Sequence, residues 1–241
     1  MLEPKAILRF AAILVVTLAL LMWPWQAWQQ AYAGYFRGLG DAAFSQFWFW
    51  SAGSVRFVNL RAPDVFDRVG ALVPVKLPEE FRKSDRFKPE GEFDTLLLLQ
   101  NRNAPGAIGI LRTSSRDIAY WSSAMVVALV MASPLAWRKK AWLFLWTFVA
   151  VHLFIIVRLS VFVAVNGFFD GTKNYCLHKC WDFVLGIWRR MEPVLCDNPT
   201  VSFVVPVFIW LIVLVGMQIW SSWREDRSRA SPAPPTPRPS R

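Results

Sequence analysis

Four apolar runs, each close to the length of a membrane-spanning helix, most constrain what this chain can form. They cover residues 7–23, 118–136, 141–165 and 201–220. About 20 apolar residues are needed to cross a hydrocarbon core of roughly 30 Å. The chain is 55% hydrophobic, above the roughly 45–50% of soluble domains, and lipid accounts for the excess. We therefore predict a membrane α-helical fold with four transmembrane helices.

Basic residues near the ends of these runs predict the orientation. If all four runs span, the cations next to them fall on one side, and loops rich in Lys and Arg stay in the cytoplasm. Both termini are then cytoplasmic, in a multi-pass protein of the bacterial inner (plasma) membrane. We expect the first run to remain as an uncleaved anchor, although Ala31-Tyr32-Ala33 offers a signal-peptidase pattern. The cations are Lys5, Arg9, Arg138, Lys139, Lys140, Arg224, Arg227, Arg229, Arg238 and Arg241.

The chain between the first two runs predicts a small exported α+β domain. Residues 26–50 are rich in Ala, Gln and aromatics and indicate one or two amphipathic helices on the membrane surface. Residues 55–60 and 71–77 have strand patterns, and turn residues 103–106 join two apolar stretches, 93–102 and 107–114, into a β-hairpin. About 60 residues make a marginal core alone, so we expect this domain to lean on the membrane helices or on a partner.

These patterns divide the chain into four parts. Residues 1–23 are the cytoplasmic N-terminus and first transmembrane helix, and residues 24–117 are the periplasmic domain. Residues 118–220 form a three-helix transmembrane region with a Cys-containing outer loop, 166–200. Residues 221–241 are a Pro/Arg-rich cytoplasmic tail that is expected to be disordered.

The net charge of +10 fits this topology better than a nucleic-acid-binding function. No soluble segment carries a stripe of Lys and Arg interleaved with aromatics, which such binding would favour. The expected partners are membrane lipid and a membrane or periplasmic protein, and we expect no cofactor.

Arg158 is the sharpest single feature, because it lies inside the third apolar run. An ionisable residue in a span indicates function or a specific pair, whereas near a helix end it can also extend its charged group to the interface. Both interpretations stay open. For His152, six residues earlier, we expect burial with a hydrogen bond to a neighbouring helix.

The three cysteines, Cys176, Cys180 and Cys196, all lie in the loop between the third and fourth runs. That loop faces the oxidising side in the predicted topology, so a disulfide is expected, with the pairing open. Cys176, His178 and Cys180 also have a spacing typical of metal ligands, but no fourth ligand is evident and we predict no metal. Residues 180–190 have helical spacing and indicate an interfacial or re-entrant helix.

The chain from about Trp121 to Trp188 resembles the core of the exosortase/archaeosortase family of membrane transpeptidases. Ser122 and Ser123 lie at the outer end of one span, a basic turn follows, Arg158 lies near the outer end of the next span, and His178 stands at the start of a further helix. The resemblance implies that these residues would be nucleophile, oxyanion stabiliser and base, in that order.

The chain departs from the family pattern at the nucleophile. A serine occupies the region of the family's cysteine, Ile155 stands where an Asn is usual, and one span plus a β-type domain replaces several leading spans. A serine hydroxyl without a strong base attacks less readily than a thiolate. The resemblance therefore implies a non-catalytic accessory or scaffold protein in exosortase-type protein sorting or surface-polymer export. The alternative is an exosortase-like transpeptidase that uses Ser122 or Ser123 with His178 and Arg158.

Overall fold

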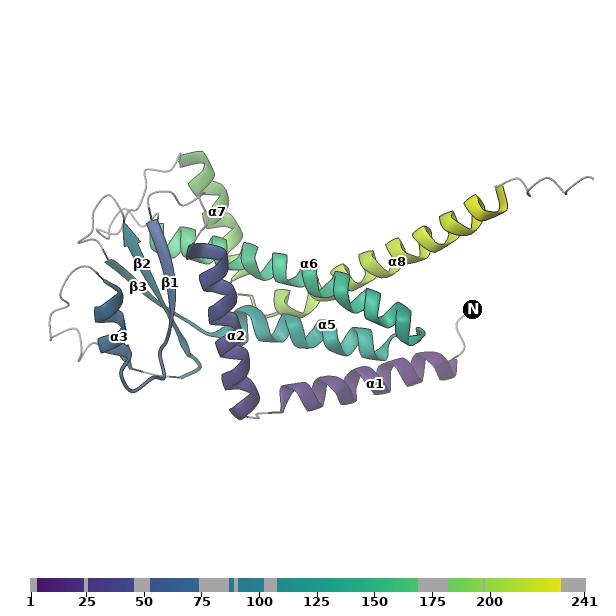
Figure 1. The fold of residues 1–241 in the computed structure, drawn as a ribbon, viewed down its shortest axis with the longest axis horizontal. Helices are drawn as coiled ribbons and strands as arrows, with labels where there is room; N and C mark the ends of the chain where they lie inside the picture. The colour runs from purple at the N-terminus through teal and green to yellow at the C-terminus, as the bar shows by residue number, and fades with distance from the viewer. Residues whose placement is uncertain are drawn as a thin grey trace, which may run out of the picture.

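The computed structural model is mainly helical, with one small sheet at one end of the helices (Figure 1). The elements are α1 (Pro4–Met22), α2 (Gln26–Ser45), β1 (Gly53–Asn59), α3 (Val65–Leu72), β2 (Thr95–Asn101), β3 (Ile108–Thr113), the π-helical turn η3 (Arg116–Tyr120), α5 (Trp121–Ala132), α6 (Trp137–Val163), a second π-helical turn η4 (Ala164–Phe168), α7 (Asp182–Leu195) and α8 (Val201–Ala230). The structure describes residues 4–23, 26–45, 53–73, 87–88, 91–101, 108–168, 182–196 and 198–230.

Three of the described helices are long and apolar enough to span a membrane: Pro4–Met22, Trp137–Asn166 and Val201–Ser222. α1 has no buried residue. Large apolar side chains such as Trp146 on α6 and Ile212 on α8 are also exposed. Exposed apolar faces of this size need lipid or another protein to cover them. The prediction of a membrane α-helical protein with a small sheet is confirmed at this level.

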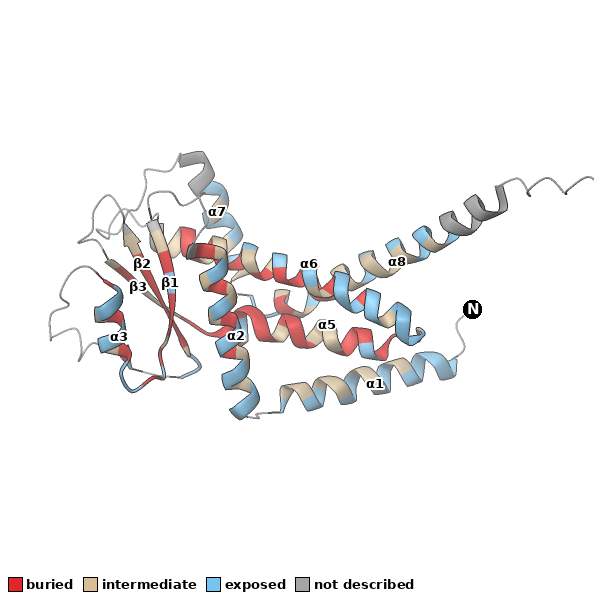
Figure 2. Ribbon diagram, viewed as in Figure 1, coloured by how far each residue is buried: buried red, intermediate tan, exposed pale blue. Residues whose placement is uncertain are grey.

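The second predicted span takes a different form. Residues 118–136 contain the end of η3 and the 12-residue helix α5, which covers about 18 Å at 1.5 Å per residue, less than the roughly 30 Å of a hydrocarbon core. α5 contacts α1, α6 and α8, and most of its side chains are buried (Figure 2). α5 is therefore the central helix of the helical part.

The sheet has the order β1-β2-β3, with both pairs antiparallel. The predicted hairpin is confirmed, because β2 and β3 pair from Thr95 opposite Thr113 to Gln100 opposite Ile108. The central strand is buried on both faces. Leu97 and Leu99 face the core shared with the helices, whereas Leu96 and Leu98 face a second core under α3. Two-sided burial explains why this strand is a continuous leucine run rather than an alternating pattern.

The strand predicted at residues 71–77 is wrong where the structure describes it. Ala71 and Leu72 end α3, whose buried Val65 and Val69 are spaced four residues apart on one helix face. This i, i+4 pair is the helical period that the short apolar run concealed. Residues 74–77 lie outside the described residues.

α2 packs on the opposite face of the sheet from α3 (Figure 1). Phe36 and Phe44 of α2 contact Phe57 of β1 with ring centroids 6.0 Å apart in both pairs. The Asp41 carboxylate accepts a hydrogen bond of 3.0 Å from the Phe57 amide. The helix predicted within residues 26–50 is thus confirmed over residues 26–45, and its apolar face covers the sheet. Its location on the membrane surface stays a prediction, and residues 46–50 lie outside the described residues.

Two segments near the C-terminus refine the predicted boundaries. The helix expected at residues 180–190 is confirmed from residue 182 and extends to Leu195. Asn166 of η4 donates a 2.5 Å hydrogen bond to Glu192 of this helix. α8 continues to Ala230, so the prediction of disorder from residue 221 is wrong for residues 221–230. Residues 231–241 lie outside the described residues.

A test of the packing of α2 on the sheet is Gly40→Ala. A Cβ atom at Gly40 would lie 2.6 Å from the Phe57 ring. We expect the free energy of unfolding to fall by roughly 1–3 kcal/mol, the usual cost of forcing extra atoms into a packed core. The matched control is Gly38→Ala on the same helix, where a Cβ meets nothing within 4 Å. Alanine should stabilise that position slightly through its helix propensity. Thermal unfolding in detergent measures both, and equal melting temperatures for the two variants would contradict this packing.

Candidate functional site

The junction between the sheet and the helices is the π-helical turn η3. It follows β3 directly and continues into α5, with the Trp121 amide donating to the Arg116 carbonyl. A π-turn has one residue more per hydrogen-bonded ring than an α-turn, and such turns are frequent at functional sites. Here the turn directs the backbone carbonyls of Asp117 and Ile118 toward α6 and α8.

Arg158 of α6 occupies these carbonyls. Its Nη1 donates to the Asp117 carbonyl at 3.2 Å, to the Ile118 carbonyl at 2.9 Å and to Ser202 Oγ at 2.7 Å. Ser202, in the first turn of α8, donates in turn to the Asp117 carbonyl at 3.1 Å. Arg158 is only 1% exposed, so its guanidinium is open to neither solvent nor lipid. The side chain instead ties α6 and α8 to η3 by charge-assisted hydrogen bonds.

Two tyrosines attach α1 and α2 to the same junction. The Tyr120 hydroxyl donates to the Leu21 carbonyl at the end of α1. The Tyr32 hydroxyl of α2 and Ser123 Oγ of α5 are 2.9 Å apart. Burial raises the pKa of Tyr32 well above its usual value. The phenol therefore stays protonated and can donate this hydrogen bond at any physiological pH.

Asp94 fastens the sheet to the turn from the other side. It precedes β2, and its carboxylate accepts hydrogen bonds from the Ser115 amide at 3.1 Å, the Ser115 hydroxyl at 2.5 Å and the Thr95 hydroxyl at 2.8 Å. Ser115 is the residue just before η3. The carboxylate therefore fixes where the hairpin ends and the helix begins.

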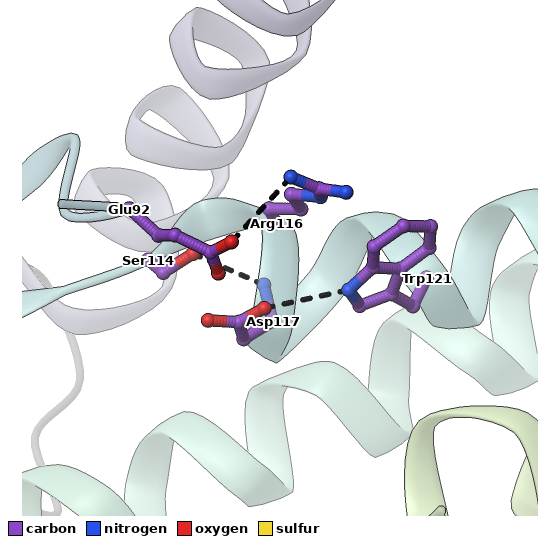
Figure 3. Close-up of polar contacts among 5 residues, drawn as sticks. All are labelled: Glu92, Ser114, Arg116, Asp117 and Trp121. Carbon is purple, nitrogen blue, oxygen red and sulfur yellow. Dashed lines mark hydrogen bonds and ion pairs between the residues drawn. The ribbon is translucent and has the colours of Figure 1, made fainter. Parts of the chain in front are cut away.

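A second set of contacts crosses the outer surface of the turn (Figure 3). Glu92 and Arg116 form an ion pair at 3.6 Å, and Ser114 Oγ accepts from the Asp117 amide at 3.2 Å. The Asp117 carboxylate accepts from Trp121 Nε1 at 3.4 Å. The Arg116 guanidinium also lies 4.5 Å from the Trp121 ring centroid. Asp117 thus uses its backbone carbonyl toward the helices and its side chain toward the surface.

A polar cleft of about 860 Å³ opens beside this junction. Its wall is formed by α2, the β1–α3 connection, the start of β2 and η3. Gly91, whose φ of +63° suits glycine, makes the turn before β2 at its edge. The lining residues are Gln26, Gln29, Gln30, Tyr32, Ala33, Arg37, Asn59, Arg61, Ala62, Pro63, Arg68, Gly91, Glu92, Asp94, Ser115, Arg116 and Tyr120. A volume of this size suits a small-molecule group or a few side chains.

The candidates from the family resemblance occupy different surroundings. Ser122 is fully buried and its hydroxyl has no hydrogen-bond partner among the described residues, whereas Ser123 bonds Tyr32. Within the described part of the chain, neither serine hydrogen-bonds Arg158, and none of the three lines the cleft. His178 lies outside the described residues, so the proposed grouping of these side chains stays a prediction.

His152 is buried, as predicted, but its partner is its own helix. Nδ1 lies 2.7 Å from the Phe148 carbonyl. The ring lies against Phe148 in a tilted contact and against Tyr35 edge to face, at centroid distances of 3.9 and 5.6 Å. Nε2 has no hydrogen-bond partner within the described residues.

The disulfide also stays a prediction, because Cys176 and Cys180 lie outside the described residues. Cys196 immediately follows α7 and lies beside the Arg158 backbone, with its Sγ 3.6 Å from the Arg158 carbonyl. A link through Cys196 would therefore connect the outer loop to the junction.

Sequence reasoning missed the acceptors of Arg158. Two of them are backbone carbonyls, which leave no side-chain signal, and Ser202 is one small polar residue at the start of a helix. Asp94 offered a signal, because a carboxylate immediately before a run of leucines does not belong to the apolar core.

No protein-family model, curated protein or solved structure matches this chain. The resemblance to exosortases thus depends on Ser122, Ser123, the basic turn, Arg158 and His178 alone.

Replacing Arg158 tests its role at the junction. Arg158→Met removes the donor to the Ile118 carbonyl, whereas Ser202 and the Asp117 carbonyl keep each other as partners. We expect the free energy of unfolding to fall by about 1–3 kcal/mol. Arg158→Lys should be intermediate, since it keeps the charge but not the planar group. The control is Arg138→Met, an exposed position at the α5–α6 turn. Thermal unfolding followed by tryptophan fluorescence would contradict this role if Arg158→Met and Arg138→Met melted alike.

Proposed function

We propose that this protein is a non-catalytic accessory or scaffold protein of the bacterial inner membrane, which acts in exosortase-type protein sorting or surface-polymer export. The helices anchor it, and the sheet with its polar cleft is presented on the periplasmic side to a partner.

The proposed topology has four crossings with both termini cytoplasmic. α1, α6 and α8 each have spanning length, and η3 with α5 supplies the fourth, short crossing in the centre. The start of α1, the α5–α6 turn and the far end of α8 all lie away from the sheet (Figure 1). Arg138, Lys139 and Lys140 at that turn favour a cytoplasmic location for this end.

The observation that carries the proposal is the engagement of Arg158. An intramembrane arginine is by default a candidate functional group, but this one donates to three protein acceptors and is 1% exposed. It lies 21 residues, or about 32 Å, beyond Trp137, which corresponds to the outer edge of a hydrocarbon core of roughly 30 Å. A cation used in this way holds the sheet in a fixed position relative to the membrane helices.

The competing function, an exosortase-like transpeptidase, is favoured by one observation. The Ser122 hydroxyl is buried with no hydrogen-bond partner among the described residues, as a nucleophile awaiting its base would be. That function requires His178 to approach Ser122 or Ser123 and requires Arg158 to leave its acceptors.

Affinity purification from the native host separates the two functions. The full chain, tagged and extracted in mild detergent, should recover an exosortase or a secretion component in a stable ratio. The Ser122→Ala and Ser123→Ala variants should recover the same partner and restore sorting or export in a deletion strain, because neither hydroxyl acts as a nucleophile in a scaffold.

Two outcomes would contradict the accessory function. One is purification of a monomer without partners under conditions that preserve other membrane complexes. The other is a serine variant that binds the partner normally yet abolishes sorting, which would support the transpeptidase. An untagged strain processed in parallel controls for adventitious recovery.

A further inference from the structure

The cleft carries a surplus of positive charge after its internal pairs are counted. Four arginines and two acidic residues line it. Arg68 pairs with Asp64 at 2.8 Å, and Arg116 pairs with Glu92 at 3.6 Å. The Asp94 carboxylate accepts hydrogen bonds only from uncharged groups of Ser115 and Thr95, so its charge offsets part of the remaining positive charge, and a surplus of one is left. Among the described residues, no ion pair neutralises the remaining two, Arg37 and Arg61.

Arg37 is the more informative of the two because it is half-buried. Burial lowers the pKa of Arg37, and attraction by Asp94 acts in the opposite direction. The guanidinium nevertheless stays charged near neutral pH. A partly desolvated cation without an ion pair favours an anion beside it, and the planar guanidinium fits phosphate and carboxylate oxygens in a bidentate manner.

α2 supplies uncharged donors next to this cation. Gln26, Gln29, Gln30, Ala33 and Arg37 all line the cleft, and their spacing places them on one face of the helix. The side-chain amides of the glutamines can donate to phosphate oxygens and accept from hydroxyl groups. The cleft therefore suits a polar anion that carries hydroxyl or ester oxygens.

The location of the cleft indicates the source of the anion. Tyr120 lines the cleft and donates to the carbonyl of Leu21, one residue before α1 ends. α2 begins four residues after α1 ends and contributes the first of the glutamines. If α1 spans the bilayer, one wall of the cleft lies at the depth of the lipid headgroups, where phosphate is the abundant anion.

We propose that the cleft binds the phosphate group of an anionic membrane lipid, with Arg37 and Arg61 as its ligands. The bound headgroup lies against the polar face of α2 and fixes the sheet domain against the outer leaflet. This proposal does not depend on the identity of the protein partner.

The test is lipid binding by the full chain in detergent, followed by native mass spectrometry and by thermal shift. Phosphatidylglycerol should bind and stabilise the protein, and zwitterionic phosphatidylcholine should do so at least about tenfold more weakly. The double variant Arg37→Gln/Arg61→Gln should lose this preference. The control Arg138→Gln/Lys139→Gln removes the same charge at exposed positions at the other end of the helices and should keep it.

Further measurements distinguish the ligand sources and guard against misfolding. Arg61→Gln alone changes an exposed side chain and should already weaken phosphatidylglycerol binding if the double variant fails to fold. Competition by millimolar inorganic phosphate would support recognition of phosphate itself from either source. If inorganic phosphate does not compete and the preference for phosphatidylglycerol is retained, the result would support the lipid as the ligand.

Three outcomes would overturn the proposal. The first is an absence of preference for phosphatidylglycerol over phosphatidylcholine. The second is an equal loss of binding in the cleft and control variants, which indicates general attraction between charges. The third is that recovery of a protein partner requires Arg37 and Arg61, whereas lipid binding does not require them. The cleft would then be a site for an acidic protein segment.

Discussion

The buried guanidinium of Arg158 and the π-turn that accepts its hydrogen bonds are the constraint on which the remaining structure depends. The η3 turn presents the backbone carbonyls of Asp117 and Ile118 to Arg158 of α6. A charge in this position is tolerable only when such acceptors are fixed in place. Residues 40 or more positions apart in sequence are thereby held at one point, where η3, α6 and the start of α8 meet.

The sheet domain depends on the same turn from the opposite side. Asp94 holds Ser115 where β3 gives way to η3, and Asp41 holds β1 on α2. α2 also reaches α5 through Tyr32 and Ser123. The cleft lies between α2, the β1–α3 connection, the start of β2 and η3. The cleft is consequently a feature of the assembled chain and belongs to neither part alone.

Much of this architecture could be predicted from the sequence, because it follows from local patterns. The apolar runs indicate α1, α6 and α8, and the turn residues 103–106 between two apolar stretches indicate the β2–β3 hairpin. Arg158 is recognisable as a charge within an apolar run. What it binds is not recognisable, since backbone carbonyls about 40 residues away leave no trace in residue types. The cleft was equally hidden, because it combines α2, the β1–α3 connection and η3. The shortness of α5 was obscured by a run of apolar residues that continues past the end of the helix at Ala132.

Hydrogen–deuterium exchange of an Arg158→Gln variant tests most directly whether this junction couples the sheet to the membrane helices. The structure predicts faster exchange in η3 and α5 and also in β2 and β3, which are attached to the turn through Asp94 and Ser115. An Arg138→Gln control should match the unchanged protein. Faster exchange confined to α6 around residue 158, with the strands unaffected, would contradict the account, because Arg158 would then stabilise only its own helix.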